Sequence, residues 1–239
     1  MALYRRNAVR FLAVLAVLVF SGHAAAYDFE GTVRVSGPPY PDPRFIPIEK
    51  KPVRGFPENV LSQSLLISPE GGLQNAVVVL EGGAADVLAG PSEIVPPQME
   101  LDQKDYLFDP HVVVLPAGAS LKILNSDGLA HDVRAFNEDS KMLFRYDVDP
   151  GKSVEALFEK PGNCVLRCGL HHWMHAFVIV VSSPHYAVTD AHGGFRIEDV
   201  PPGNYAVRIW HEILGESGTA IEMMDSVRNF EYTYPSEIR

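Results

Sequence analysis

The segment 168–175 holds the side chains of this sequence that are best suited to chemistry. It reads Cys-Gly-Leu-His-His-Trp-Met-His, so that Cys168, His171 and Met174 are separated by two residues each, and another histidine, His131, lies upstream. One thiolate, two imidazoles and one thioether form the donor set of a mononuclear blue copper site, because soft sulfur ligands suit Cu(I) and imidazole binds both oxidation states. The geometry of such a set is a compromise between those that Cu(I) and Cu(II) prefer. The ligands therefore move little when the copper ion gains or loses an electron.

The spacing of these residues also favours a common site. A tight loop can bend Cys168, His171 and Met174 toward one point, with a fourth ligand supplied by the end of a neighbouring strand. Taken singly, each has a simpler explanation: a lone methionine usually packs in a core, as Trp173 is expected to do, and a lone histidine usually lies at the surface. Because the chain has only 2 cysteines and 6 methionines, four matching donors are hard to explain by chance. The pattern therefore favours a metal site.

The second cysteine, Cys164, permits two other interpretations. In an extended strand, four residues of ~3.3 Å each separate the Cα atoms of Cys164 and Cys168 by ~13 Å, whereas a disulfide tolerates at most ~7 Å, so we expect two thiols. The pattern Cys164-x3-Cys168-x3-His172 resembles the ligand loop of the dinuclear copper centre of oxidases, but His175 stands where that loop continues to methionine. We expect Cys164 to be a small buried hydrophobe instead.

Four other histidines have simpler expected roles. His172 and His175 flank the candidate ligands and are expected to be exposed loop residues, although they are also suited to a second metal or to contact with a redox partner. His111 is expected at the rim of a strand. His211, within a Trp-His-Glu triplet, is expected at a surface strand end, with a contribution across a domain interface as the alternative.

The elements that must position these residues are predicted to be strands. Apolar segments of four to eight residues, rich in Val, Ile, Phe and Tyr, alternate with turn residues, which suits half-buried strands. Together with 19 glycines and 19 prolines they indicate β-sandwiches rather than βαβ units. Only 212–224 has a weak helical signal, and the proline-rich segment 37–57 is expected to be an irregular arm. The expected strands are 29–35, 76–80, 111–115, 121–125, 153–158, 164–168, 176–181, 195–197, 206–210 and 229–234.

Turn-forming residues also divide the sequence. Pro96-Pro97 and Ser182-Ser183-Pro184 bracket a block of strands of about 85 residues, the size of one small sandwich. The piece that follows is too short to bury a sandwich core alone. We therefore expect 27–95 and 183–239 to pair as a second, smaller and discontinuous sandwich, with the domain 96–182 inserted between them. The alternative is that each flank packs separately on the central domain.

The start of the chain predicts an export signal. A basic region, an apolar run at 11–20 and Ala24-Ala25-Ala26 have the order of a secretory signal peptide, which assigns residues 1–26 to it. The run is too short to cross a bilayer, so the mature chain is expected to be periplasmic or secreted and to have no membrane span. The formal net charge of −10 argues against nucleic acid as a partner.

Several motifs together resemble the cupredoxins. They are Phe108-x-Pro110-His-Val112-x-Val114-x-x-Gly118, Leu121-x-Ile123-x-Asn125-x-Asp127, His131-Asp-Val133 and Cys168-x-x-His171-x-x-Met174. The short ligand loop looks most like that of amicyanin, and the wider chain resembles secreted proteins labelled methylamine utilisation or plastocyanin-like.

The resemblance covers roughly 98–181. It implies an eight-stranded Greek-key cupredoxin sandwich that binds one copper ion through His131, Cys168, His171 and Met174. The sequence departs from the family at Asp132, where cupredoxins often have asparagine. A carboxylate beside the thiolate would favour Cu(II) and lower the potential.

The flanks resemble a different fold. The segment 190–207, which contains Gly-Gly-Phe-Arg-Ile and Pro-Pro-Gly-Asn-Tyr, is similar to the carboxypeptidase regulatory-like (transthyretin-like) sandwich. Gly31-Thr-Val33 and Ala76-Val-Val78 match the N-terminal strands of that fold. Such sandwiches are generally spacers or docking modules, so the resemblance adds no chemistry.

The combined prediction is a carrier of single electrons between protein redox partners, with His171 as the exit for electrons and Met174 as an axial ligand. We do not expect an enzyme, because hydrolase and phosphate-loop motifs are absent and four protein ligands leave no open coordination position. Two alternatives stay open. One is a copper-binding or delivery module without redox cycling, and the other is a metal-free structural or interaction protein.

Overall fold

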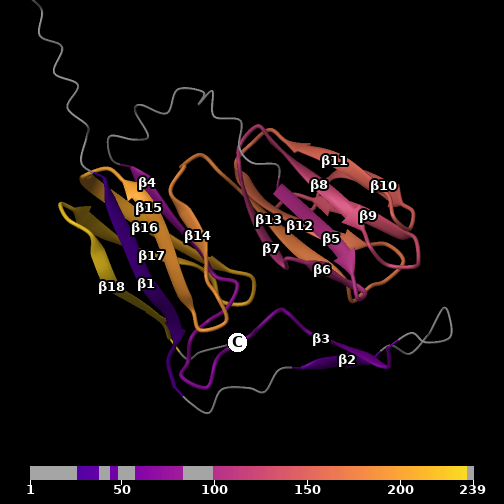
Figure 1. Cartoon of the computed structure of the whole chain (residues 1–239), viewed down its shortest axis with the longest axis horizontal. Coiled ribbons are helices and arrows are strands. Elements are labelled where there is room, and N and C mark those ends of the chain that lie inside the picture. The colour runs from indigo at the N-terminus through magenta and orange to yellow at the C-terminus, as the bar shows by residue number, and fades with distance from the viewer. Residues whose placement is uncertain (1–25, 38–43, 48–56, 83–98, 236–239) are drawn as a thin grey trace, which may run out of the picture.

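The computed structural model describes residues 26–37, 44–47, 57–82 and 99–235. Every regular element within these ranges is a strand, which confirms the all-β fold class (Figure 1). The predicted signal peptide and the expected boundary at residues 95 and 96 lie outside the described residues, Ala26 excepted. Within the described part of the chain, no helix is long and apolar enough to cross a membrane.

Nine strands from the middle of the chain form the sandwich on the right of Figure 1. One sheet has the order β10-β9-β12-β13-β7 and the other the order β11-β8-β5-β6. Within them, β13 pairs with β7 and β5 pairs with β8 in parallel. The strands are β5 (Met99–Lys104), β6 (Leu107–Asp109), β7 (Val112–Pro116), β8 (Ala119–Asn125), β9 (His131–Phe136), β10 (Met142–Val148), β11 (Ser153–Phe158), β12 (Gly162–Cys168) and β13 (His175–Val181).

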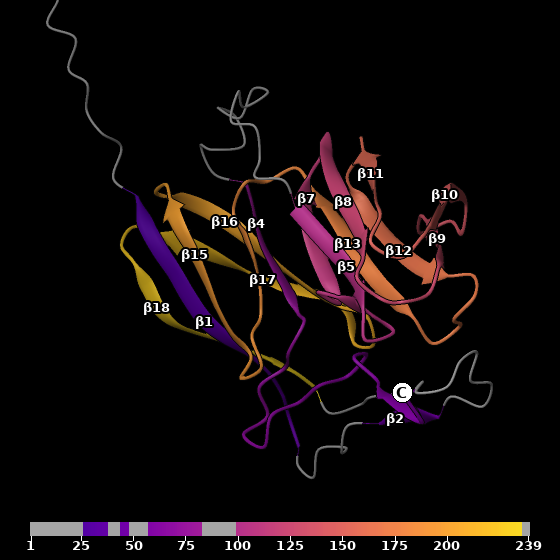
Figure 2. The same cartoon turned by 45° about the vertical axis from the view of Figure 1, so that its right-hand side comes forward.

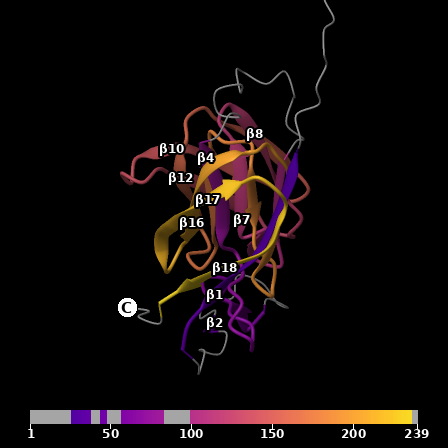
Figure 3. The ribbon, with the colours of Figure 1, turned by 90° about the vertical axis from the view of Figure 1, so that its left-hand side faces the viewer.

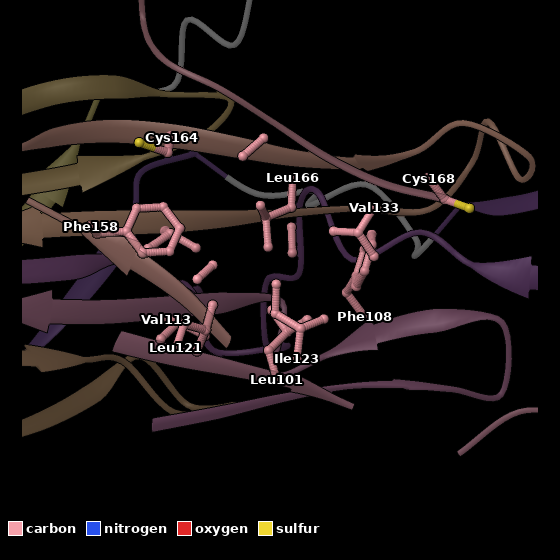
Figure 4. Close-up of a cluster of buried hydrophobic side chains, with 14 of the residues drawn as sticks. Leu101, Phe108, Val113, Leu121, Ile123, Val133, Phe158, Cys164, Leu166 and Cys168 are labelled. Atoms are coloured by element: carbon pink, nitrogen blue, oxygen red, sulfur yellow. The ribbon is translucent and has the colours of Figure 1, made fainter. Parts of the chain in front are cut away.

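The core of this sandwich follows from the alternation of side chains along each strand. Inward positions of β8 include Leu121 and Ile123, both fully buried, and β12 contributes Leu166 between its two cysteines. Because side chains two residues apart point to the same face of a strand, Cys164 and Cys168 belong to this core as well. Figure 4 shows their sulfur atoms at opposite ends of the buried cluster.

Strands from both flanks form a second sandwich, on the left of Figure 1. Its sheets have the orders β14-β4-β16-β17 and β15-β1-β18, so each sheet contains strands from before and after the first sandwich in sequence. The weak helical signal at 212–224 does not correspond to a helix, because this segment turns after β16 and returns beside it as an antiparallel strand. The strands are β1 (Tyr27–Val35), β4 (Val77–Gly82), β14 (Tyr186–Val188), β15 (Gly194–Val200), β16 (Gly203–His211), β17 (Gly215–Met223) and β18 (Val227–Tyr234).

The segment expected to be an irregular arm contains a strand. β2 (Phe45–Pro47) pairs with β3 (Asn59–Leu61), below the two sandwiches in Figure 2. Val60 of β3 is buried in the core of the first sandwich, together with Leu101 and Phe108. The rest of the expected arm, residues 38–43 and 48–56, lies outside the described residues.

The two sandwiches pack on each other through apolar faces of β4, β7 and β13. Viewed from the side, the second sandwich lies in front of the first (Figure 3). Val77 of β4, Val112 of β7 and Ile179 of β13 belong to one buried cluster, in which Trp210 also lies. The neighbouring residues of these strands point into the cores of their own sandwiches, so these strands are buried on both faces. This burial explains their nearly unbroken apolar sequences.

Candidate metal centre

Three of the four predicted ligands converge at one end of the first sandwich. His131 is the first residue of β9, Cys168 is the last residue of β12, and His171 lies in the loop that leads to β13. The Sγ atom of Cys168 lies 3.6 Å from Nδ1 of His131 and 3.6 Å from Nδ1 of His171, and the two Nδ1 atoms lie 3.0 Å apart. All three side chains are buried. The first imidazole thus lies on the same end of the sandwich as the loop.

The dimensions of this triangle suit a metal ion. A triangle with sides of 3.0, 3.6 and 3.6 Å has a point about 2.0 Å from every corner, close to metal–nitrogen bonds of ~2.0–2.1 Å and metal–sulfur bonds of ~2.3 Å. The donor set and its spacing therefore fit a bound ion without rearrangement of the loop.

The fourth predicted ligand, Met174, is the last residue of the loop before β13, and its side chain is fully buried. Its backbone N–H donates to the carbonyl of His171 at 2.9 Å, and its own carbonyl accepts from the N–H of Cys168 at 3.1 Å. These two hydrogen bonds close the loop into a compact turn that fixes the backbones of Cys168, His171 and Met174. Trp173, expected in the core, is buried and donates its Nε1–H to the carbonyl of Tyr106 at 3.0 Å.

The electrostatics of the triangle favour the thiolate. Burial raises the pKa of Cys168, but hydrogen bonds from His131 and His171 and from backbone groups outweigh burial and lower this pKa to about 5. Burial lowers the pKa of His131, but its hydrogen bonds with Asp127 and Cys168 outweigh burial and raise this pKa to about 9. The thiolate is the form of cysteine that binds metals.

Asp127 orients the first imidazole and was not identified from the sequence as a functional residue. Its Oδ2 accepts from Nε2 of His131 at 3.0 Å and from the backbone N–H of Tyr106 at 3.1 Å. A carboxylate on the outer nitrogen of a metal-binding histidine fixes the ring and raises its basicity. Asn125 holds the same turn, because its Nδ2 donates to the carbonyls of Leu129 and Val148 at 2.8 Å each. The Asn-Ser-Asp-Gly turn at 125–128, in which the aspartate lies four residues before His131, was the available signal.

The structure changes the interpretation of Asp132. Its carboxylate was expected to act as a negative charge beside the thiolate, but it accepts from Nε of Arg134 at 3.0 Å and from Nε of Arg145 at 2.8 Å. The guanidinium groups, Arg134 foremost, hold the pKa of Asp132 below its usual range. Its backbone carbonyl accepts from the N–H of Gly169 at 2.7 Å, and a side chain at position 169 would collide with the Asp132 carboxylate. Asp132 therefore braces the loop, with its charge balanced by two cations.

Cys164 takes no part in this arrangement. It is buried at the far end of the core, and burial raises the pKa of its thiol to about 11. Both cysteines are free thiols, as the spacing along the strand predicts. A dinuclear centre needs both sulfur atoms at one place, and the structure separates them by the length of the core (Figure 4).

Three of the other four histidines differ from their expected positions. His172 is exposed, as expected, but His175 is half-buried. His111 was expected at a rim and is 3% exposed, and His211 was expected at the surface and is 1% exposed. Both expectations were wrong for one reason: the two sandwiches cover each other's strand ends at this place.

Comparisons with known proteins give likenesses only among solved structures. No protein-family model matches the sequence, and no curated protein matches it either. The chain is similar to a purple cupredoxin from Nitrosopumilus maritimus at 20% identity and a TM-score of 0.33, over 35% of this chain and 100% of that one. It is similar to the P52G mutant of amicyanin at 14% identity and a TM-score of 0.34, over 44% and 98%. A copper-containing nitrite reductase from Thermus scotoductus SA-01 is 22% identical with a TM-score of 0.31, over 35% of this chain and 22% of that one.

Proposed function

We propose that this protein holds one copper ion between His131, Cys168 and His171, with Met174 as a weak fourth ligand, and carries single electrons between protein partners. The observation that carries the proposal is the buried triangle of one sulfur and two nitrogen atoms with sides of 3.0 to 3.6 Å. Copper would supply a one-electron couple at this place, because thiolate and imidazole ligands serve both of its oxidation states.

The residues around the triangle suit this role. Burial of the ligands excludes water, and the hydrogen bonds of the loop hold the donors in fixed positions. Leu170, next to His171, is 61% exposed and supplies an apolar contact for a partner at the nearest surface. The acidic chain, with a formal net charge of −10, would favour partners with basic surfaces. We propose that the protein is not an enzyme. Its proposed location is periplasmic or secreted, which follows from the signal peptide predicted at residues 1–26.

The test is electrochemical. The full chain is loaded with Cu(II), freed of excess metal, and examined by voltammetry and for electron self-exchange. A reversible one-electron couple with fast self-exchange is the expected result. Transfer of Cu(I) to an acceptor chelator without a reversible couple would contradict electron transfer and favour a delivery module. Failure to retain copper would contradict the whole proposal and favour a structural role.

A second prediction concerns the carboxylate behind His131. In Asp127→Asn the affinity for Cu(II) should fall about 10- to 100-fold, because the neutral amide orients the ring but no longer raises its basicity. Asp127→Ala should lower the affinity at least as far, since it also removes the acceptor for the N–H of Tyr106. Competition titrations with a copper chelator measure both. Asp139→Asn, in an exposed turn, is the control, and equal affinities for all four proteins would contradict the role of Asp127.

A further inference from the structure

A second group of metal-binding side chains lies where the two sandwiches meet. Nε2 of His111 lies 2.5 Å from Oε1 of Glu212, and Nε2 of His175 lies 3.3 Å from Oε2 of the same carboxylate. One ligand atom from each residue falls within 4.8 Å of the other two. None of these residues belongs to the copper triangle.

Three separate segments bring this group together. His111 immediately precedes β7 and His175 is the first residue of β13, and the parallel pairing of these strands sets the two imidazole rings 5.1 Å apart. Glu212 follows β16 of the other sandwich. Packing of Trp210 on Phe177, with ring centroids 5.1 Å apart, holds the end of β16 against β13. The cluster therefore exists only when both sandwiches are docked.

The cluster is built around a buried carboxylate that two imidazoles contact. The side chain of Glu212 is 8% exposed and that of His111 is 2% exposed. Burial raises the pKa of Glu212, but hydrogen bonds from His111 and His175 outweigh burial and lower this pKa to about 2. A buried carboxylate requires a cation or protonated neighbours beside it, and the two imidazoles meet it at this place. Nδ1 of His111, also buried, has no hydrogen-bond partner among the described residues.

We infer that His111, His175 and Glu212 form a second metal site, for a divalent ion of borderline softness such as Zn²⁺. Two imidazoles and one carboxylate are a three-ligand set that zinc uses when a fourth position is left open. This set lacks the sulfur that favours Cu(I). Tetrahedral ligands with bonds of ~2.0–2.1 Å lie ~3.3 Å apart. The distance of 3.3 Å between Nε2 of His175 and Oε2 of Glu212 fits this spacing. Nε2 of His111 lies 2.5 Å from the other carboxylate oxygen, Oε1, so His111 and Glu212 must move apart to take up an ion.

An ion has access to this site from solvent. An open hollow of about 560 Å³ is lined by His175 and Glu212, and also by His172 and Arg167. Oγ of Ser64 lies 3.1 Å from Nε2 of His175, so a hydroxyl group also contacts this imidazole. The fourth coordination position would therefore face the hollow and take a water molecule. This site stands on its own contacts and does not depend on copper at the triangle.

The test counts zinc in the full chain. Because the triangle also binds zinc ions in principle, the measurement uses Cys168→Ser, which removes its thiolate. Equilibrium dialysis against Zn²⁺ with a competing chelator should give one ion per chain. Adding Glu212→Gln or His111→Gln should weaken the affinity at least about 100-fold, the upper end of what loss of a supporting residue costs. Adding His192→Gln, at an exposed histidine, should change nothing.

Two results would overturn the inference: no zinc retained by Cys168→Ser, or equal affinity with and without Glu212 and His111. A measurement without substitution at the cluster covers the case in which those variants do not fold. In the Cys168→Ser chain with ¹⁵N-labelled histidine, Zn²⁺ should shift the ring resonances of His111 and His175 and leave that of His192 in place. Shifts confined to His131 and His171 would show that zinc occupies the triangle only, and the second site would then be rejected.

Discussion

Cys168→Ser is expected to abolish the intense visible absorption of the copper-loaded protein, and Cys164→Ser is expected to leave it unchanged. Such absorption arises from charge transfer between a thiolate and copper, and only the sulfur of Cys168 lies within 3.6 Å of both imidazoles. A serine hydroxyl is a hard, neutral donor that neither produces this band nor suits Cu(I). Visible absorption and electron paramagnetic resonance spectra of the three proteins measure the effect.

The cysteine pair is its own matched control, since both side chains are buried and both lie on β12. Loss of the absorption in both variants would contradict the mononuclear site. If the unsubstituted protein also gave the hyperfine pattern of a mixed-valence copper pair, the result would favour a dinuclear centre. Retention of the absorption in Cys168→Ser would rule out this thiolate as the ligand. Comparison of thermal unfolding among the three proteins separates loss of the ligand from loss of the fold.

The second large effect is a loss of stability on acidification that depends on His211. Burial lowers the pKa of His211 from 6.5 to about 4, with the charge of Glu212 opposing burial and that of His111 reinforcing it. The unfolded chain therefore binds a proton at His211 at a higher pH than the folded chain does. As the pH falls from about 6.5 to about 4, the free energy of unfolding should decrease by roughly 3 kcal/mol on account of this group. Above pH 6.5 the group should have no effect.

His211→Asn isolates this contribution. Nδ1 of His211 accepts from the backbone N–H of Ile213 at 3.2 Å, and the side-chain oxygen of asparagine can take over this hydrogen bond. Urea unfolding of the metal-free chain between pH 7 and pH 4 should show a smaller decrease in stability for the variant than for the unsubstituted protein. His192→Asn, at an exposed position, should behave like the unsubstituted protein. Parallel pH profiles for His211→Asn and the unsubstituted chain would contradict the prediction.

Local patterns predicted much of the fold. The alternating and continuous apolar segments identified ten of the strands, because a side chain's direction in a strand depends only on its position in the sequence. They did not identify β5, β6, β9, β10 and β14. The segment 212–224 was the one weak candidate for a helix, although β17 forms there. Its burial is low and its polar residues carry no clear period, so the pairing with β16 decides its structure. β2 and β3 were missed for a similar reason, since each is only 3 residues long and exists through the pairing with the other.

The candidate copper site was predictable because most of it is local. Cys168, His171 and Met174 lie within one turn, and hydrogen bonds between their own backbones close that turn. His131 required the further step of pairing β9 with β12, which brings Val133 opposite Cys168. The residues that support the ligands were not predicted: Asp127 and Asp132 are ordinary loop and strand carboxylates until their partners are known.

By itself the sequence determined the all-β class, the identity and order of the sulfur and nitrogen donors, and the separation of the two thiols along one strand. These properties depend on residue type and on distances along a short stretch of chain. Only the tertiary structure decided that the charge of Asp132 is balanced by Arg134 and Arg145, and that His111, His175 and Glu212 meet. The contacts of Asp132 depend on the pairing of β9 with β10. The meeting of the other three depends on how the two sandwiches dock, which joins His111 to Glu212 across 101 positions of the chain.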